Sequence, residues 1–400
     1  MTVKIEKSIA KGIIKAPPSK SMAHRALICG ALSEGAEIGN LAYSKDIQAT
    51  VDCLEKMGAY VEKRIDSVKI GGLNSENVSE NVEVFCNESG STLRFLIPLA
   101  MLFGKKVTFY GSERLFERPL GVYEDICKAQ GIFFEKKRDR VTVYGKIKSG
   151  EYSIPGDISS QFITGLLFVL PLLEKDSTLT VTGKFESASY IDLTLSVMRF
   201  FGVEISREDN VFYVKGGQKY NPQSYTVEGD CSNAAFLEAF NLLGGNVEVT
   251  GINPHTLQGD RVYKTMFNAL KNNEHKFDLS DCPDLAPIMF AMAAKHDGAE
   301  FTGTARLKIK ESDRALAMAE ELSKFGIGVS VFGDSVTVHK GALKVPTEAL
   351  KGHNDHRIVM ALSLLCSVTG GTIEGAESVA KSYPDYFEEI EKIGIKVKRQ

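Results

Sequence analysis

Basic side chains stand at corresponding places in this sequence, at or just before the starts of predicted helices. They are Lys20, Arg25, Arg118, Arg314, Arg357 and Lys381. Guanidinium groups bind carboxylates and phosphates through paired hydrogen bonds, and an ammonium group adds a point charge. Each residue taken alone is more often a solvated surface charge. Together, in equivalent places, they predict a site for a small ligand with several negative charges.

Hydroxyl, amide and carboxylate side chains accompany these cations. Ser159, Ser160 and Gln161 precede an apolar run, and hydroxyl groups at a helix start suit a phosphate. Asp284 and Glu311 are acidic residues among the basic ones, so a carboxylate there could move a proton while the cations hold the substrate. Two simpler interpretations stay open, because Asp284 could cap a helix and Glu311 could form an ordinary ion pair.

Apolar runs that follow short polar clusters predict the helices that position these residues. The runs cover 22–33, 93–103, 162–173, 234–243, 285–294 and 358–368. Runs that are apolar on every side are typical of buried helices, and Ser, Asp or Asn before them is typical of an N-cap. A helix start carries partial positive charge and binds anions. The pattern therefore predicts a set of anion-binding helix starts.

A second repeat is in step with the first. Amphipathic helices that end at Gly, each followed by strand-like segments, are predicted to begin at 46, 120, 191, 314 and 386. The copy at 261–276 lacks the Gly and has a shortened hairpin. The repeating unit is a buried helix, a strand, an amphipathic helix and two strands, with a period of about 67 residues. The pattern predicts an α/β protein with mixed sheets, built as two similar domains of three units each.

The chain of 400 residues is long enough for two domains. We place domain I at 1–17 plus 229–400 and domain II at 18–228, with crossings near 16–18 and 227–229. The segment 3–7 precedes the first unit, so we expect it to complete the C-terminal domain as a strand. We expect the active site in the cleft between the domains.

Composition narrows the class of protein. The formal net charge is −3 and 25% of residues are charged, which favours neither nucleic acid nor a membrane surface as a partner. The seven cysteines are scattered, which predicts reduced thiols in a cytoplasmic protein. Residues 1–12 do not resemble a signal peptide, and the longest apolar runs are too short to span a bilayer.

Other motifs are absent or weak. Neither glycine-rich nucleotide loop occurs, and no Ser-His-Asp or Cys-His arrangement is evident. His353 and His356 have a spacing compatible with a metal, but the sequence offers no third ligand of matching kind nearby. We therefore predict no metal site.

Short motifs along the whole chain resemble those of the 3-phosphoshikimate 1-carboxyvinyltransferase (EPSP synthase) family. They are KSMAHR at 20–25, ERP at 117–119, SSQF at 159–162, KESDR at 310–314, NDHR at 354–357 and KSYPD at 381–385. The resemblance implies two domains of three βαβαββ units, an inside-out α/β barrel or prism joined by a two-strand hinge. It also implies transfer of the enolpyruvyl group of phosphoenolpyruvate to the 5-hydroxyl of shikimate 3-phosphate, in the shikimate pathway to chorismate and aromatic amino acids.

The resemblance also implies roles for individual residues, with no metal or organic cofactor and a monomeric enzyme. The residues expected to bind shikimate 3-phosphate are Lys20, Ser21, Arg25, Ser159, Ser160, Gln161, Ser187, Tyr190, Asp284 and Lys310. Those expected to bind phosphoenolpyruvate are Lys20, Gly90, Arg118, Gln161, Arg314, Arg357 and Lys381. Asp284 is expected to accept the hydroxyl proton and Glu311 to protonate the methylene carbon, with Lys20 as a third catalytic residue. Glu88 and Arg306 depart from a common family pattern, in which Asn often stands at each place.

Three alternative functions are weighed. The related transfer to UDP-N-acetylglucosamine uses a reactive Cys in a mobile loop, and the corresponding loop, 111–118, has no Cys. RNA 3′-phosphate cyclase shares the fold unit, but no nucleotide site is apparent here. A non-catalytic sugar-phosphate sensor would keep the cations and lose the acid or the base, whereas Asp284 and Glu311 are both present.

Overall fold

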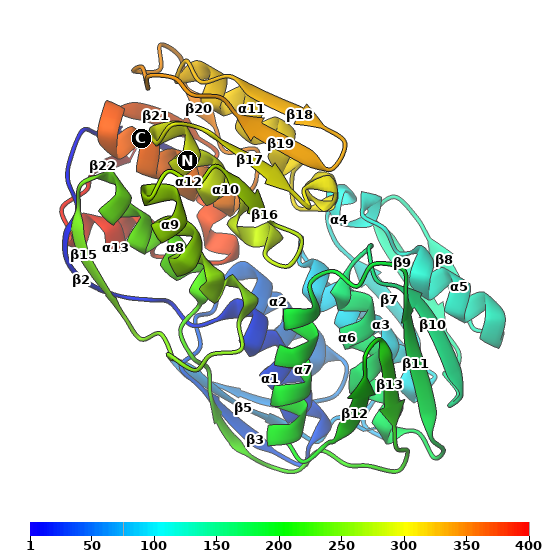
Figure 1. Ribbon diagram of the computed structural model, residues 1–400. Coiled ribbons are helices and arrows are strands. Elements are labelled where there is room, and N and C mark those ends of the chain that lie inside the picture. The colour runs from blue at the N-terminus through cyan, green and yellow to red at the C-terminus, as the bar shows by residue number, and fades with distance from the viewer. Residues whose placement is uncertain (75, 400) are drawn as a thin grey trace. The chain divides into compact units, whose positions relative to one another are not determined.

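The computed structural model describes residues 1–74 and 76–399. Contacts between residues divide the chain into two compact units. Unit 1 comprises Met1–Pro17 with Gly229–Gln400, and unit 2 comprises Pro18–Glu228. Figure 1 shows the helices and strands of each unit. The mixed α/β architecture predicted from the repeats is confirmed in both units.

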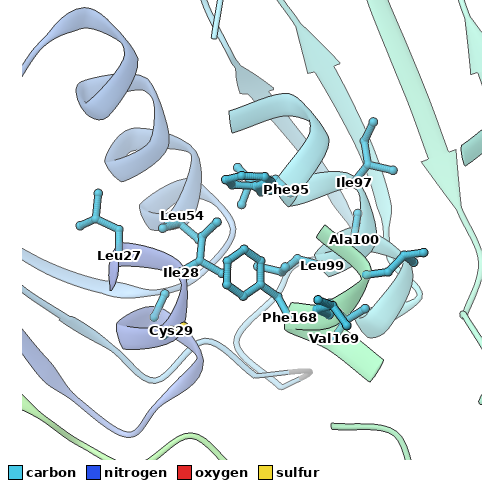
Figure 2. Close-up of a cluster of buried hydrophobic side chains, with 14 of the residues drawn as sticks. Leu27, Ile28, Cys29, Leu54, Phe95, Ile97, Leu99, Ala100, Phe168 and Val169 are labelled. Atoms are coloured by element: carbon cyan, nitrogen blue, oxygen red, sulfur yellow. The ribbon is translucent and has the colours of Figure 1, made fainter. Parts of the chain in front are cut away.

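Three helices form the centre of unit 2. They are α1 (Lys20–Leu32), α3 (Gly90–Phe103) and α6 (Ser160–Val169). Each is buried along nearly its whole length because its residues are apolar on every side. Figure 2 shows part of this core, where the rings of Phe95 and Phe168 meet edge to face with centroids 5.5 Å apart.

The buried helices of unit 2 begin at serine N-caps. Ser89 Oγ accepts a hydrogen bond from the Thr92 N–H at 3.2 Å, and Ser159 Oγ accepts one from the Gln161 N–H at 3.3 Å. The helices α1 and α3 therefore begin slightly before the predicted apolar runs. This shift places Lys20 and Gly90 in the first helical turn, where free N–H groups face an incoming anion.

Mixed sheets surround these helices in unit 2. Their strand orders are β14-β3-β5-β4, β6-β7-β9-β8 and β10-β11-β13-β12. In each sheet the first two strands are parallel and the last two form an antiparallel hairpin. The strands are β3 (Ala36–Gly39), β4 (Tyr60–Lys63), β5 (Ser67–Gly71), β6 (Asn81–Phe85), β7 (Lys106–Tyr110), β8 (Phe133–Lys136), β9 (Arg140–Tyr144), β10 (Glu151–Pro155), β11 (Ser177–Thr182), β12 (Ile205–Glu208), β13 (Val211–Val214) and β14 (Ser224–Thr226).

Amphipathic helices connect the strands of unit 2. They are α2 (Lys45–Lys56), α5 (Gly121–Gln130) and α7 (Ala188–Phe200), with the short α4 (Glu113–Glu117) before α5 and a 3-10 turn at Leu170–Leu172. The helix α5 ends at Gly131, whose left-handed conformation (φ 70°) closes the last turn, as the sequence pattern predicts.

Unit 1 repeats this plan with its own buried helices, α8 (Cys231–Glu238), α10 (Ala286–Lys295) and α12 (His356–Thr369). Its outer helices are α9 (Tyr263–Lys271), α11 (Arg314–Lys324) and α13 (Tyr386–Lys392). The predicted runs 234–243 and 285–294 are part α-helix and part 3-10 helix, with 3-10 turns at Ala239–Leu243 and Pro283–Leu285. Further 3-10 turns cover Gly259–Val262, Ala305–Ile309 and Ala376–Lys381.

The sheets of unit 1 use both ends of the chain. Strand orders are β20-β21-β1-β22, β16-β17-β19-β18 and β15-β2. The N-terminal strand β1 lies antiparallel between β21 and β22, with Val3 opposite Ile373 and Arg399, so it completes the C-terminal repeat as expected. The strands are β1 (Thr2–Glu6), β2 (Lys11–Lys15), β15 (Asn246–Thr250), β16 (Lys276–Asp278), β17 (Ala299–Thr302), β18 (Val329–Phe332), β19 (Ser335–Val338), β20 (Leu350–Lys351), β21 (Gly371–Glu374) and β22 (Lys396–Arg399).

The degenerate repeat gives a reduced sheet. Among the described residues, β15 pairs only with β2, in parallel, where the other sheets have four strands. The helix α9 ends at Asn272 rather than at a Gly, and β16 begins soon after it and joins the next sheet. All the sheets in the described part of the chain are open, and none closes into a barrel. No helix among those residues is long and apolar enough to cross a membrane.

Candidate active site

The predicted site residues fall into two groups, one in each unit. The unit 2 group comprises Lys20, Ser21, Arg25, Gly90, Arg118, Ser159, Ser160, Gln161, Ser187 and Tyr190. The unit 1 group comprises Asp284, Lys310, Glu311, Arg314, Arg357 and Lys381.

Lys20 is held in the first turn of α1 by an ion pair. Its Nζ lies 2.8 Å from Oδ2 of Asp46, and the two side chains are only 16% and 11% exposed. Asp46 lies in the first turn of α2, where a negative charge is favoured by the helix dipole. The pair fixes the ammonium group at the start of a buried helix. The sequence analysis did not single out Asp46, because it lies in another helix.

Arg25 joins two helices of unit 2. Its Nε donates to Thr194 Oγ1 at 2.8 Å, Nη1 donates to the Ser21 carbonyl at 2.7 Å and Nη2 donates to the Tyr190 carbonyl at 3.0 Å. These partners are neutral, and burial lowers the pKa of Arg25 to about 10, still well above neutral pH. Three predicted residues, Ser21, Arg25 and Tyr190, are thus brought together with a positive charge that no carboxylate among the described residues neutralises.

Gln161 joins the starts of α3 and α6. Its Oε1 accepts a hydrogen bond from Arg94 Nη1 at 2.7 Å, and its Nε2 donates to Ser91 Oγ at 3.0 Å. Arg94 also donates through Nη2 to the Pro119 carbonyl at 3.0 Å, and its guanidinium lies 5.1 Å from the centre of the Phe162 ring. The sequence analysis did not place Arg94 in the site, because the residue stands inside an apolar run.

Serine side chains stand at the starts of two helices in unit 2. Ser159 caps α6 and Ser160 is buried in its first turn. Ser187 precedes α7 with a left-handed backbone (φ 58°) and is also buried. A non-glycine residue in this region is strained, and such strain is often stored at functional sites. These helix starts supply N–H and hydroxyl donors for an anion.

Arg118 lies against Gly90. A Cβ atom added to Gly90 would stand 2.6 Å from Nη1 of Arg118, so a larger residue there would displace the guanidinium. Arg118 is 7% exposed, and its Nε has no hydrogen-bond partner among the described residues. A buried guanidinium with an unused donor beside a helix start is suited to an anionic ligand.

In unit 1, cations surround the carboxylate of Asp284. Oδ1 lies 2.8 Å from Arg314 Nη1 and 3.3 Å from Lys310 Nζ, and Oδ2 lies 2.9 Å from Arg357 Nη2. Burial would raise the pKa of Asp284, but Arg357, Lys310 and Arg314 together hold that pKa well below its ordinary value. We call these four residues the Asp284 cluster. The side chain of Asp284 does not cap a helix, so the capping interpretation is wrong.

Arg314 connects the candidate acid to the candidate base. Its Nη2 lies 2.8 Å from Glu311 Oε2, while its Nε lies 2.9 Å from Oδ2 of the fully buried Asp355. Burial alone would lower the pKa of Arg314. The carboxylates of Asp355, Glu311 and Asp284 raise the pKa by more than burial lowers it, so the net shift is upward. Asp355 also caps α12 by accepting from the Arg357 N–H at 3.0 Å. One buried carboxylate therefore positions both Arg314 and the helix start that carries Arg357.

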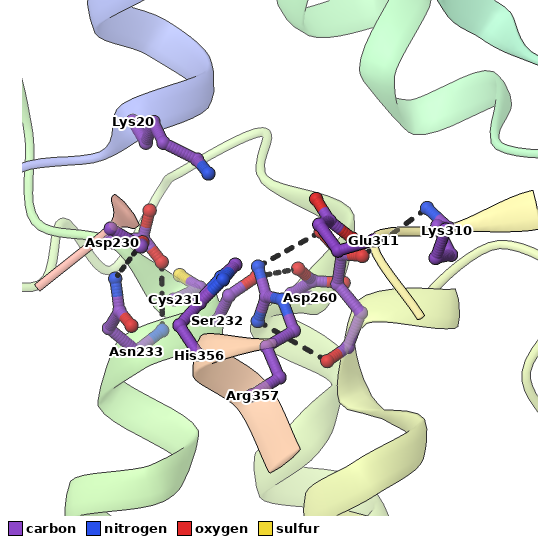
Figure 3. A network of polar contacts seen from close by, with 12 residues as sticks. Lys20, Asp230, Cys231, Ser232, Asn233, Asp260, Lys310, Glu311, His356 and Arg357 are labelled. Carbon is purple, nitrogen blue, oxygen red and sulfur yellow. Dashed lines mark hydrogen bonds and ion pairs between the residues drawn. The ribbon is translucent and has the colours of Figure 1, made fainter. Parts of the chain in front are cut away.

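A second buried carboxyl group lies close to this cluster. Asp260 accepts a hydrogen bond from Ser232 Oγ at the start of α8 (Figure 3). Burial and the neighbouring charge of Asp284 raise the pKa of Asp260 to about 6. Lys381 is buried too and donates to the carbonyl of Asn354, just before α12. Neither Asp260 nor Asp355 was singled out from the sequence, because each was set in a polar cluster read only as a helix start or a loop.

The structure also shows the surroundings of the remaining residues that the sequence analysis named, Arg306, Glu88, His353 and His356. Arg306 is buried in unit 1 and donates through Nη2 to the Ser280 carbonyl at 2.6 Å. Glu88 is half-buried just before the N-cap of α3. His353 and His356 do not share a site, because His353 Nε2 contacts Glu321 at 2.8 Å while His356 lies beside Asp355.

The search for metal ligands in the sequence overlooked one cluster. Glu320, Glu321 and His353 offer ligand atoms within 4.8 Å of one another, and His353 lies 32 residues after Glu321 in the chain. Lys324 Nζ lies 3.0 Å from Glu321 Oε2, so an ammonium group already occupies one side of this cluster. The chemistry of the cluster is that of an ion-pair network around the buried Glu321.

Comparisons with known proteins show which proteins the chain is similar to. Residues 5–390 match the family model described as EPSP synthase (3-phosphoshikimate 1-carboxyvinyltransferase). The 3-phosphoshikimate 1-carboxyvinyltransferase of Clostridium kluyveri is 41% identical over 420 residues, with 98% of this chain and 97% of the relative covered. That of Clostridium acetobutylicum is 40% identical with the same coverage. An EPSP synthase structure from Acinetobacter baumannii shares the fold, with a TM-score of 0.78, 22% identity and full coverage of both chains.

Proposed function

The chain belongs to the EPSP synthase family, and from that premise we propose how its residues carry out the family's reaction. The enzyme is a transferase that moves the enolpyruvyl group of phosphoenolpyruvate to the 5-hydroxyl of shikimate 3-phosphate, releasing phosphate in the shikimate pathway. The observation that carries our residue assignment is the pairing of Arg314 with both Asp284 and Glu311. Through this pairing, the carboxylates that we propose as base and acid contact one buried guanidinium.

The unit 2 group is proposed to bind shikimate 3-phosphate. Ser159, Ser160 and Ser187 lie at helix starts, where N–H and hydroxyl donors would hold the phosphate. Arg25 would hold the substrate carboxylate, because its charge is buried among neutral partners that leave it uncompensated. Ser21 and Tyr190, which Arg25 links, would contact the ring.

Phosphoenolpyruvate is proposed to take cations from both groups. Lys20, Arg118 and Gln161, beside Gly90, would contact it from unit 2, and Arg314, Arg357 and Lys381 from unit 1. The support is chemical. A phosphate and a carboxylate on one small molecule need several hydrogen-bond donors. Neither the unit 1 group nor the unit 2 group alone supplies both enough donors and the acid–base pair. This assignment requires the two groups to meet around the substrates. Small-angle scattering should show compaction when both substrates are added, and an unchanged profile would contradict the shared site.

The proposed reaction balances in three proton transfers, and the proton that Asp284 takes finally leaves with the phosphate. Glu311 donates a proton to the methylene carbon, which makes the neighbouring carbon electrophilic, and the 5-hydroxyl attacks that carbon as Asp284 takes its proton. The tetrahedral intermediate then loses phosphate while the methyl group gives a proton back, which restores the double bond. Lys20, Lys310 and the guanidinium groups stabilise the charge on the carboxylate and leaving phosphate. No step in this scheme requires a metal or an organic cofactor.

The decisive experiment compares two acceptors. Phosphate release from phosphoenolpyruvate is measured with shikimate 3-phosphate and, separately, with UDP-N-acetylglucosamine. We expect turnover with the first acceptor alone, because the loop 111–118 has no cysteine and Arg25 and the serine helix starts suit a small phosphorylated acid. Turnover with the second acceptor would overturn the assignment. Binding of both substrates without turnover would indicate a sensor.

We propose that the enzyme acts as a monomer in the cytoplasm. All seven cysteines are buried free thiols, which suits a reducing compartment. Sedimentation equilibrium at micromolar concentration is expected to give the mass of one chain, 43.8 kDa. A mass of two chains would contradict this part of the proposal.

A further inference from the structure

The candidate base is bound by the cations that the substrate needs. Oδ1 and Oδ2 of Asp284 contact Arg314 and Arg357, both proposed to bind phosphoenolpyruvate, and Lys310, proposed to contact the acceptor substrate. A carboxylate within 2.8 Å of Arg314 and 2.9 Å of Arg357 occupies the positions in which a substrate carboxylate or phosphate would be held. Asp284 therefore competes with the substrate for these donors.

This pairing also conflicts with a role as a base. An efficient general base has a proton affinity matched to its operating pH. The neighbouring cations, led by Arg357, instead hold the pKa of Asp284 well below its ordinary value. As long as these contacts persist, Asp284 is a weak proton acceptor.

The geometry shows which contacts can exchange. The side chain of Asp355 is fully buried and bound to Arg314, Ser312 and the first turn of α12, so it stays with Arg314. The side chain of Asp284 is 19% exposed, whereas that of Asp355 is 0% exposed. Of these two partners, Asp284 is the one that an arriving anion can replace, while Asp355 keeps Arg314 in place.

We propose that Asp284 occupies the anion site of unit 1 until phosphoenolpyruvate displaces it, and that this displacement activates Asp284 as the base. The inference rests on the proposed function and deepens it, because it makes activation of the base depend on the bound substrate. The substrate's phosphate and carboxylate take over Arg314 and Arg357, and the carboxylate of Asp284 is left beside other acidic groups. The hydroxyl proton can then move to Asp284.

The groups that face Asp284 support the second half of this inference. Its positive neighbours are Lys310, Arg314 and Arg357, and its acidic neighbour Asp260 lies in the turn before α9. Asp260 is buried and bound to Ser232, so it does not move away with the cations. When the cations pair with the substrate instead of Asp284, repulsion from Asp260 and from the substrate's own charge favours the protonated form of Asp284.

The first test measures binding rather than turnover. With shikimate 3-phosphate left out, so that the wild type cannot turn over, Asp284→Asn should bind phosphoenolpyruvate roughly tenfold more tightly than the wild type, because the competing charged hydrogen bonds are gone. Isothermal titration calorimetry gives the dissociation constants. Asp281→Asn is the matched control, since it removes the same charge from an exposed position in the same loop. Equal or weaker binding by Asp284→Asn, or the same gain in Asp281→Asn, would overturn the proposal.

The second test measures the base itself during turnover. Displacement predicts that the acidic limb of the kcat profile, which reports the substrate complex, lies at higher pH than that of kcat/KM. Asp260→Asn should move the kcat limb back towards lower pH, because it removes the repelling charge. Coincident limbs in the wild type would contradict displacement. If the wild type instead shows no transfer to shikimate 3-phosphate, the proposed function fails, whereas the binding test with phosphoenolpyruvate still decides this inference.

Discussion

The arginines proposed to bind substrate in unit 2 and those in unit 1 are held by different kinds of partner, although Lys20 of unit 2 also pairs with a carboxylate, that of Asp46. Arg25 donates to hydroxyl and carbonyl oxygens, so its charge remains available to a ligand, and Arg94 donates to the Gln161 amide oxygen and the Pro119 carbonyl. Arg314 and Arg357 instead pair with carboxylates, Arg314 with Asp284, Glu311 and Asp355. Unit 2 is therefore arranged to attract an anion, and unit 1 to exchange one anion for another. Under the proposed assignment, the first arrangement would supply most of the binding energy and the second would supply proton transfer.

The largest expected effect comes from removing the proton-transfer groups of unit 1. Glu311→Gln and Asp284→Ala should each lower kcat by about 10²–10⁴-fold, the usual contribution of a general acid or base. Phosphate release with both substrates measures this. Shikimate 3-phosphate binding should change little, because the unit 2 group is intact. A near-normal rate in either variant would show that the substituted residue has no catalytic role. The proposed difference between the two units would then lose its support.

A smaller effect is expected from removing an uncompensated cation of unit 2. Arg25→Met should raise KM for shikimate 3-phosphate about 10–100-fold, since a hydrogen bond to a charged group contributes roughly 1.5–3 kcal/mol. Arg64→Met is the control, because Arg64 is an exposed residue of the same unit that pairs with Glu37 and Glu62. If both variants had the same KM, Arg25 would serve the fold alone. Thermal unfolding of each variant separates that outcome from loss of binding.

A milder change tests the fit between Gly90 and Arg118. Gly90→Ala places a methyl group where it meets the guanidinium, so Arg118 must move by a few tenths of an ångström or more. We expect KM for phosphoenolpyruvate to rise about tenfold, equivalent to 1.4 kcal/mol of binding, with little change for shikimate 3-phosphate. Gly121→Ala is the matched control, because its added Cβ would meet no atom within 4 Å. An unchanged KM in Gly90→Ala would show that Arg118 does not hold this substrate.

Much of this arrangement could be predicted from the sequence because it depends on local pattern. The buried helices, the Gly-terminated outer helices and the return of β1 to the last sheet follow from apolar runs, caps and period-2 segments. The pattern also marked the catalytic candidates Asp284 and Glu311, since acidic residues among cations at helix starts are conspicuous. The strand β2 was missed, because its partner β15 is distant in the chain and three of its five residues are Lys or Gly.

What the pattern did not give is the pairing between distant residues. Asp46 lies in another helix from Lys20, and Asp355 is separated from Arg314 by a hairpin, so nothing in local spacing assigns them to each other. Arg94 stands inside an apolar run. Its place in the site can be recognised only once its contact with Gln161 is known. The resemblance to a family supplied roles for single residues but not the contacts that position them.

The smallest effect concerns stability at low pH, and it also separates the two units. The pKa of Asp284 and that of Asp355 are lowered in the folded chain by their cations, although burial alone would raise them. A lowered folded-state pKa adds stability that is present above the unfolded value and is lost as the pH falls through the folded value. The free energy of unfolding, measured with urea, should therefore decrease as the pH falls below about 4, the ordinary pKa range of an aspartate. Asp355→Asn, which keeps a helix-capping side chain, should be less stable at pH 7 and lose less of its stability on acidification. The same stability loss in wild type and variant would place the acid-sensitive groups outside unit 1's ion-pair network, and the contrast with unit 2 would then not extend to stability.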